Sequence, residues 1–284
     1  MRLAGWIGLL LGTLLASPVR GDDGASGDYY ARIRANDAPI AGRFTIAAYF
    51  LDSLDVAVRL PGPGRILAVH FRESNGENAF LIPGDLVLEG RDQTRWTGGF
   101  APLGEARLAG QLPKGEGRWA LWWIPVGQDT LHWESPADLK LHYGFSESAF
   151  VPLKEKDARS TRDAFPWAEA TKAVLDPSGS TANPVAPDPA AFDQAPEVKT
   201  RRNPEYPHIA RAYGFEGSVH LVVRVNETGR VEDAYVLQSD ALHELKVSAL
   251  VAVMEWVFHP GRKEGRPVAG EMIIPIRFSL GTVK

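Results

Sequence analysis

A proline-rich stretch near the middle of the chain is the feature that most restricts how this sequence can fold. Five prolines lie between Thr171 and Glu197, among mostly small and polar residues. Because proline fixes φ and has no backbone N–H, such a stretch favours an extended linker over a helix or a central strand. The sequence therefore predicts a linker at residues 171–197 and a separate folding unit on each side of it, the second being residues 198–284.

Residues 28–151 are rich in short apolar segments separated by turn signals. The punctuation includes Pro61-Gly62-Pro63-Gly64 and Asn75-Gly76, which are typical of tight turns. Several segments alternate apolar and polar residues, as half-buried antiparallel strands do. We therefore predict an all-β N-terminal domain, a sandwich or a barrel, whose role the sequence does not reveal. The strand-length segments are Arg43–Leu51, Asp55–Leu60, Arg65–Phe71, Asp85–Gly90, Arg118–Ile124, Thr130–Glu134 and Asp138–Phe145.

Residues 1–21 have the pattern of an export segment. Arg2 precedes the apolar run Leu3–Ala16, and Ser17, Pro18 and Gly21 then interrupt it. This order predicts a cleaved signal peptide. The alternative is an uncleaved N-terminal anchor, because residues 3–19 reach the lower limit of length for a membrane span.

The C-terminal unit combines helical and strand patterns. Residues 207–213 suit a short helix that starts at a proline and ends at Gly214. Two alternating segments on either side of residues 226–229 predict a hairpin. A helix is then expected from Ser239 or Asp240 to about Trp256, stopped by Pro260-Gly261. Residues 271–280 alternate again and predict a last strand.

Pro275 predicts that this last strand lies at the edge of its sheet. Proline cannot donate to a strand ladder, so it is tolerated where its backbone faces outward. Alternate residues of a strand direct their backbone groups to the same side. The backbone N–H and C=O groups would therefore also point outward at the other residues of this set, which are Glu271, Ile273, Arg277 and Ser279. Such an edge can pair with another chain. The alternative is a β-bulge at Pro275 that serves no partner.

An ordered series of motifs over residues 203–280 resembles the TonB C-terminal domain family. The series begins with "YPHIARAYGFEGSVHLVVRVNETGRVEDAYVLQS", continues with "ALVAVMEWVFHPG" and ends with "IIPIRF". The resemblance covers less than a third of the chain. The residues that mark the family pattern are Tyr206, Pro207, Gly214, Gly217, Gly229, Trp256, Pro260 and Gly261.

The resemblance implies a small α+β domain with a three-stranded antiparallel sheet and two helices. In the family, the last strand binds the TonB box, a short segment of an outer-membrane TonB-dependent receptor, by strand addition, and so supports energy-dependent transport. The implied location is the periplasm, with an inner-membrane motor complex driven by proton-motive force as a further partner. The implied peptide-binding residues are Asn203, Glu271, Ile273, Pro275, Arg277 and Ser279.

A second interpretation uses the same edge differently. The first histidine of the chain is His70, and Thr13 is the one polar residue within the apolar segment 3–16. The family archetype has a Ser and a His there that engage the motor. The alternative is therefore a non-transducing envelope adaptor or scaffold, which would form a homodimer or pair with another protein through its last strand.

Other chemistry receives little support from the residues. The chain has no Cys, which excludes thiolate catalysis and cysteine metal sites, and it has no nucleophile motif, so we expect no enzyme activity, no cofactor and no metal site. A pI near 6.0 gives no indication of nucleic-acid binding. His132 and His142 are expected at strand surfaces. A tryptophan cluster predicts either a packed core or a ligand platform; its members are Trp96, Trp119, Trp122, Trp123 and Trp133.

Overall fold

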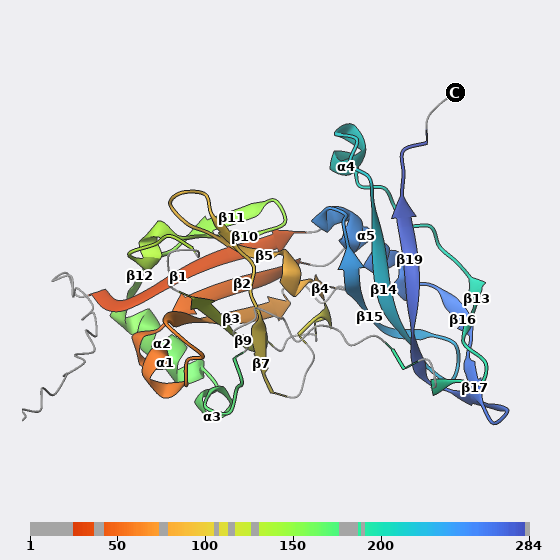
Figure 1. Cartoon of the computed structure of the whole chain (residues 1–284), viewed down its shortest axis with the longest axis horizontal. Helices are drawn as coiled ribbons and strands as arrows, with labels where there is room; N and C mark the ends of the chain where they lie inside the picture. The colour runs from red at the N-terminus through yellow and green to blue at the C-terminus, as the bar shows by residue number, and fades with distance from the viewer. Residues whose placement is uncertain are drawn as a thin grey trace, which may run out of the picture.

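The chain forms two packed units joined by the proline-rich stretch (Figure 1). The computed structural model describes residues 25–36, 43–73, 79–104, 108–112, 117–125, 131–175, 187–188 and 191–281. The expected signal peptide or anchor at residues 1–21 lies outside these ranges. None of the helices within the described ranges is long and apolar enough to cross a membrane.

The N-terminal unit is built on two antiparallel sheets. The larger has six strands in the order β12-β1-β2-β3-β9-β7, and the smaller has four in the order β11-β10-β5-β6. The strands of the larger sheet are β1 (Ala25–Asn36), β2 (Arg43–Phe50), β3 (Gly64–Glu73), β7 (Phe100–Leu103), β9 (Gly117–Pro125) and β12 (Val151–Lys154). Those of the smaller are β5 (Leu86–Glu89), β6 (Arg95–Trp96), β10 (Lys140–Tyr143) and β11 (Ser146–Ala149). β4 (Phe80–Leu81) pairs with β8 (Gly110–Gln111).

The main core of this unit lies between the two sheets. Phe44, Phe71 and Trp122 of the larger sheet join Leu88 and Tyr143 of the smaller in one apolar cluster. The rings of Phe44 and Tyr143 meet edge to face at 5.4 Å. This is the face-to-face packing of a sandwich, and it follows from the alternation of apolar residues along the strands.

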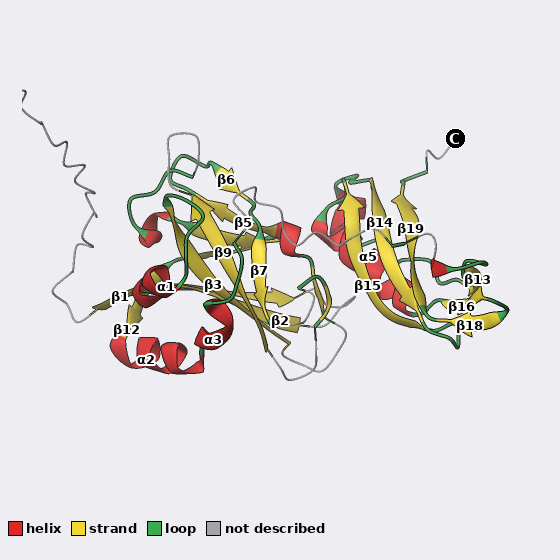
Figure 2. Ribbon diagram, turned by 60° about the horizontal axis from the view of Figure 1, so that its bottom comes forward, coloured by secondary structure: helices red, strands yellow, loops and turns green. Residues whose placement is uncertain are grey.

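Helices cover the opposite face of the larger sheet. α1 (Asp52–Ala57), α2 (Glu155–Ala164) and α3 (Trp167–Ala170) lie beside it in Figure 2. Leu54, Phe165 and Ala170 form a second cluster with strand residues such as Trp123. The expectation of an all-β unit therefore missed its helical layer, and the unit continues past residue 151 through β12, α2 and α3. With both faces covered, the adjacent residues Trp122 and Trp123 are each buried, on opposite sides of the sheet.

The ends of the proline-rich stretch pack onto the two units. Leu175 is buried against the helical layer of the first unit. At the other end, the Phe192 ring lies close to Gly261 and Gly270 of the second unit, and Asp193 N–H donates to the Arg262 carbonyl at 2.9 Å. Both ends of the predicted linker, residues 171–197, are thus anchored to folded structure.

The C-terminal unit contains a three-stranded antiparallel sheet in the order β15-β14-β19. Its strands are β14 (Gly217–Val225), β15 (Val231–Ser239) and β19 (Gly270–Phe278), and its helices are α4 (His208–Ala212) and α5 (His243–Met254). α5 packs on one face through Leu245, Ala249 and Val253. Two small strand pairs complete the unit: β13 (Glu197–Thr200) with β16 (Val257–His259), and β17 (Gly261–Lys263) with β18 (Arg266–Val268).

The long helix begins later than expected, at His243, and ends at Met254, close to its expected end at about Trp256. Ser239 and Asp240 do not cap it, because Ser239 Oγ accepts from Ala241 N–H and Asp240 Oδ1 accepts from Ser218 N–H. These contacts fix the β15–α5 turn, so the helix starts at His243. It stops before Pro260-Gly261, because residues 257–259 leave it to form β16 with the end of the linker.

The two units share an apolar contact. Phe80 and Ile82, which belong to the N-terminal unit by sequence, pack in the same cluster as the core of the C-terminal unit, and Phe80 is fully buried. At the same junction, Asp85 lies between His243 and Lys246 of α5. The buried ring of Phe80 and the shielded ion cluster at Asp85 therefore hold the two units together.

Candidate functional site

β19 is an edge strand with a continuous ladder on its inner side. It pairs with β14 from Gly217↔Phe278 to Val225↔Gly270 without a register shift, and Pro275 faces His220. The alternative of a β-bulge at Pro275 is therefore wrong. Within the described residues, no strand pairs with the outer side of β19.

Pro275 determines which backbone groups of β19 point outward. Because proline has no N–H, the pair His220↔Pro275 is of the type without mutual hydrogen bonds. The pairs on either side, such as Val219↔Ile276 and Leu221↔Ile274, then carry the ladder. By the same alternation, the N–H groups of Glu271, Ile273 and Arg277 point away from β14, and Ser279 continues the series just beyond the strand.

The side chains of β19 separate into a core face and an open face. Ile274, Ile276 and Phe278 are buried, whereas Pro275, Arg277 and Ser279 are exposed. Ile273 is 44% exposed, whereas Ile274 and Ile276 of the same strand are buried. Glu271 is held by the Tyr235 hydroxyl at 3.4 Å. The edge thus presents a short apolar surface, formed by Ile273 and Pro275, next to the positive charge of Arg277.

The opposite edge of the same sheet faces the N-terminal unit. β15 lies on the side nearest that unit in both views (Figures 1 and 2). Gln111 N–H of β8 donates to Asp233 Oδ1 of β15 at 3.4 Å, and Gly110 lies against the same residue. The first unit therefore covers part of β15, and the sheet has its open edge at β19.

The segment before α4 is fixed beside the outer end of β19. The Tyr206 ring packs edge to face on Phe278 at 5.6 Å, and its hydroxyl donates to the Phe215 carbonyl at 2.6 Å. Desolvation and the negative charge of Glu216 raise the pKa of Tyr206, so this hydroxyl keeps its proton. The Arg211 guanidinium lies over the Tyr206 ring, 5.2 Å from its centroid.

Asn203 lies in this segment and is exposed. The indole N–H of Trp256 donates to the carbonyl of the neighbouring Arg202 at 2.7 Å, and Arg202 also pairs with Glu255. The hydrogen bond of Glu255 and its charge raise the pKa of Arg202. The segment 202–206 is therefore held against α5 while the Asn203 side chain stays open to solvent.

The other residues that mark the sequence pattern support the backbone. Gly214 and Gly229 have φ of +70° and +82°, and a Cβ on Gly229 would lie 1.9 Å from the Phe258 carbonyl oxygen. Gly217 packs on Ala241, and Gly261 packs on Phe192. Pro207 is buried at the start of α4, and Pro260 follows β16.

Three exposed apolar side chains near this end of the sheet were not singled out from the sequence. Ile209, Tyr213 and Phe215 are 39%, 72% and 38% exposed, and the two aromatic rings stack at 6.0 Å. Their signal in the sequence is weak, because the spacing 209–213 is also that of an ordinary buried helix face.

The remaining candidates do not form a chemical site. His132 pairs with Asp92, and His142 lies between Glu89 and Glu147. No group of three potential metal ligands occurs in the residues that the structure describes. The five tryptophans of the cluster are buried or partly buried against the two cores, which favours the core interpretation over a ligand platform.

Comparison with known proteins relates the C-terminal part of the chain to one family. Residues 202–280 match the family model of the Gram-negative bacterial TonB protein C-terminal domain. This segment belongs to the TonB C-terminal family. The TonB protein of Vibrio cholerae is 36% identical over 102 residues, which are 36% of this chain and 40% of that protein. The TonB protein of Salmonella typhimurium is 26% identical over 129 residues, 45% of this chain and 50% of that protein.

The likeness to TonB is confined to part of each protein. The chain spans half or less of the length of these two curated relatives. Among solved structures, the solution structure of the Pseudomonas aeruginosa TonB C-terminal domain is 26% identical and has a TM-score of 0.27, covering 32% of this chain and 93% of that one. The family-model match begins at residue 202, after the proline-rich stretch, so this match leaves the N-terminal sandwich unassigned.

Proposed function

We propose that this chain is a TonB-family protein of the periplasm that binds an extended segment of an outer-membrane transporter. The segment adds to β19 as a further strand, in the manner of a TonB box, and the complex supports energy-dependent transport across the outer membrane. Family membership of residues 202–280 supports the class of partner. The open edge of β19 supports the mode of binding.

The outward backbone groups of β19 are the observation on which this proposal depends. Ile273 and Arg277 direct their N–H groups outward on either side of Pro275. A guest strand would satisfy them and place its side chains beside Ile273 and Arg277. Unpaired, such an edge risks association between copies, which Pro275 and the charge of Arg277 restrain.

A pair of proline variants tests this mode of binding. Ile273→Pro and Arg277→Pro each remove one outward N–H and leave the ladder to β14 intact. One net hydrogen bond is worth about 0.5–1.5 kcal/mol, so each variant should weaken binding of a synthetic TonB-box peptide about two- to tenfold in a calorimetric titration. Ile273→Val is the matched control, because it keeps the N–H and should change affinity little.

The reciprocal variant strengthens the test. Pro275→Val adds an outward N–H at the centre of the edge, so it should bind the peptide at least as tightly as the parent chain. Circular dichroism and thermal unfolding would establish that all variants are folded. Unchanged affinity in both proline variants would exclude strand addition at β19, and so would a stable dimer that ignores the peptide in sedimentation experiments.

A further inference from the structure

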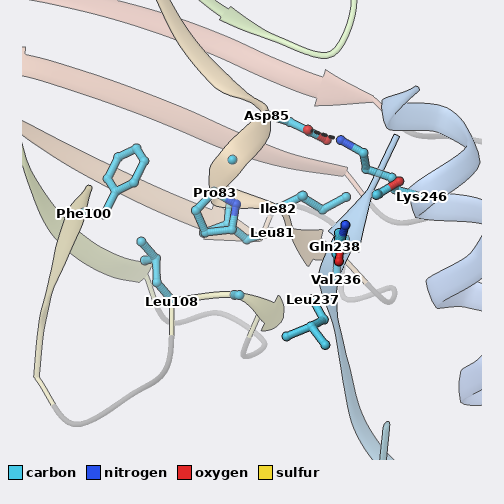
Figure 3. A pocket seen from close by; sticks show the side chains of 13 residues that line it. Leu81, Ile82, Pro83, Asp85, Phe100, Leu108, Val236, Leu237, Gln238 and Lys246 are labelled. Atoms are coloured by element: carbon cyan, nitrogen blue, oxygen red, sulfur yellow. Dashed lines mark hydrogen bonds and ion pairs between the residues drawn. The ribbon is translucent and has the colours of Figure 1, made fainter. Parts of the chain in front are cut away.

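A cavity of about 240 Å³ lies at the junction of the two units, on the side of the sheet away from β19. Residues of β4 and the following turn form one wall, and residues of β15 form the other (Figure 3). Since neither unit closes the cavity alone, its shape depends on the docked arrangement of both.

The wall from the N-terminal unit is apolar apart from Asp85. Leu81, Pro83, Phe100 and Leu108 line it, and Leu237 faces them from β15 (Figure 3). A register shift between Val236 and Gln238 marks a β-bulge in β15 at this point. Bulges redirect side chains, and this one lies where Leu237 reaches the cavity. The site therefore suits a branched apolar group.

The wall from β15 also offers backbone polar groups. Because the pairs Val222↔Tyr235 and Arg224↔Asp233 carry the ladder between β14 and β15, Ala234 and Val236 direct their N–H and C=O groups away from β14. Asp233 Oδ1 accepts from Ala234 N–H at 2.9 Å. Val236 is the next outward residue, and it lines the cavity.

The two charged residues that line the cavity, Asp85 and Lys246, pair with each other. Asp85 Oδ2 lies 2.7 Å from His243 Nδ1, and Asp85 Oδ1 pairs with Lys246 Nζ. All three side chains are less than 15% exposed. The Asp85 carboxylate bonds to both Lys246 and His243, so these groups satisfy one another and, among the described lining residues, leave no unpaired carboxylate or ammonium facing the cavity. The cavity therefore favours a neutral ligand.

We propose that this cavity binds a short, neutral, extended peptide segment with a branched apolar side chain. Its backbone would pair with Val236, and its side chain would lie between Leu237 and Leu108. This is a second strand-addition site, smaller than the β19 edge and independent of it. The cavity volume limits the part of the segment that lies inside it to about one or two residues.

The test uses the full chain, labelled with ¹⁵N, and the capped tripeptide acetyl-Val-Leu-Val-amide. The expected result is a saturable shift of the Val236 amide resonance in the millimolar range or below. Acetyl-Glu-Leu-Glu-amide, which has the same length and two charges, should bind at least tenfold more weakly.

Variants place the binding in the cavity. Leu237→Trp fills the space from β15, and Leu108→Phe narrows it from the other unit; each should weaken binding at least tenfold. Val56→Trp, at a side chain that is 89% exposed, should not change it. The proposal is overturned if no saturable shift occurs, if both filling variants bind normally, or if the shifts are confined to β19. Binding of neutral N-phenyl-1-naphthylamine without binding of the tripeptide would also overturn it.

Discussion

Removal of the Asp85 carboxylate should loosen the junction between the two units. Asp85 is 11% exposed, and the side chains of His243 and Lys246 that it bonds are 7% and 14% exposed. In Asp85→Asn the shape is kept, but Lys246 loses its counter-ion in a shielded position. Breaking a buried pair in this way costs about 3–5 kcal/mol, and the partial exposure of the lysine places the expected loss near the lower end.

The pH dependence of this effect has a definite sign. Burial alone would raise the pKa of Asp85, but the hydrogen bond and charge of His243, together with Lys246, lower it below its ordinary value. A carboxyl group whose folded pKa is lowered stabilises the protein above the pKa of its unfolded state, about 4. The difference between the parent chain and Asp85→Asn should therefore be full at pH 7 and shrink as the pH falls below about 4.

Urea unfolding at pH 7 and pH 3.5 measures both effects. Glu227→Gln, which removes the same charge from an exposed hairpin turn, is the matched control and should change stability by less than about 0.5 kcal/mol. An unfolding midpoint for Asp85→Asn equal to that of the control would refute the argument. A difference that grew on acidification would refute the assigned protonation state.

Three further variants test other parts of the fold. Burial, followed by the charge of Arg72, lowers the pKa of His70 to about 4; stability should therefore fall as the pH drops from about 6.5 towards 4, and His70→Gln should flatten this part of the profile in thermal melts. Gly229→Ala should lower stability by more than about 1 kcal/mol, because a Cβ would clash with a backbone oxygen at positive φ; an unchanged melting temperature would contradict this. Trp256→Phe removes the hydrogen bond to the Arg202 carbonyl and should cost about 1 kcal/mol in urea unfolding, with faster amide exchange in the segment 202–206 as its signature.

Local backbone chemistry made much of the C-terminal unit predictable from sequence. Pro275 indicated an edge strand or a β-bulge, because it cannot donate to a ladder, and the structure places β19 at the edge of its sheet without a bulge. Gly214 was expected to end a helix in a left-handed conformation, which its φ of +70° confirms. These inferences needed only neighbouring residues or one strand.

Features that depend on contacts between distant segments were not predictable in this way. The helical layer of the N-terminal unit includes α2, whose charged sequence gives little apolar pattern, since Ala158 is its buried residue. The insertion of Phe80 into the core of the other unit cannot be seen from the sequence, because a two-residue strand carries no periodicity. The ion cluster at Asp85 joins residues 158 and 161 positions apart.

Amide hydrogen exchange along β19 tests the central claim most directly. In the free protein, the N–H groups of Ile274, Ile276 and Phe278 should be protected by the ladder, whereas those of Ile273 and Arg277 should exchange rapidly. Saturation with a TonB-box peptide should slow exchange at the second set and leave the first set unchanged. Strand addition at this edge would be contradicted if slowed amide exchange did not alternate from one residue of β19 to the next. It would also be contradicted if the peptide slowed exchange on β15 and left exchange on β19 unchanged.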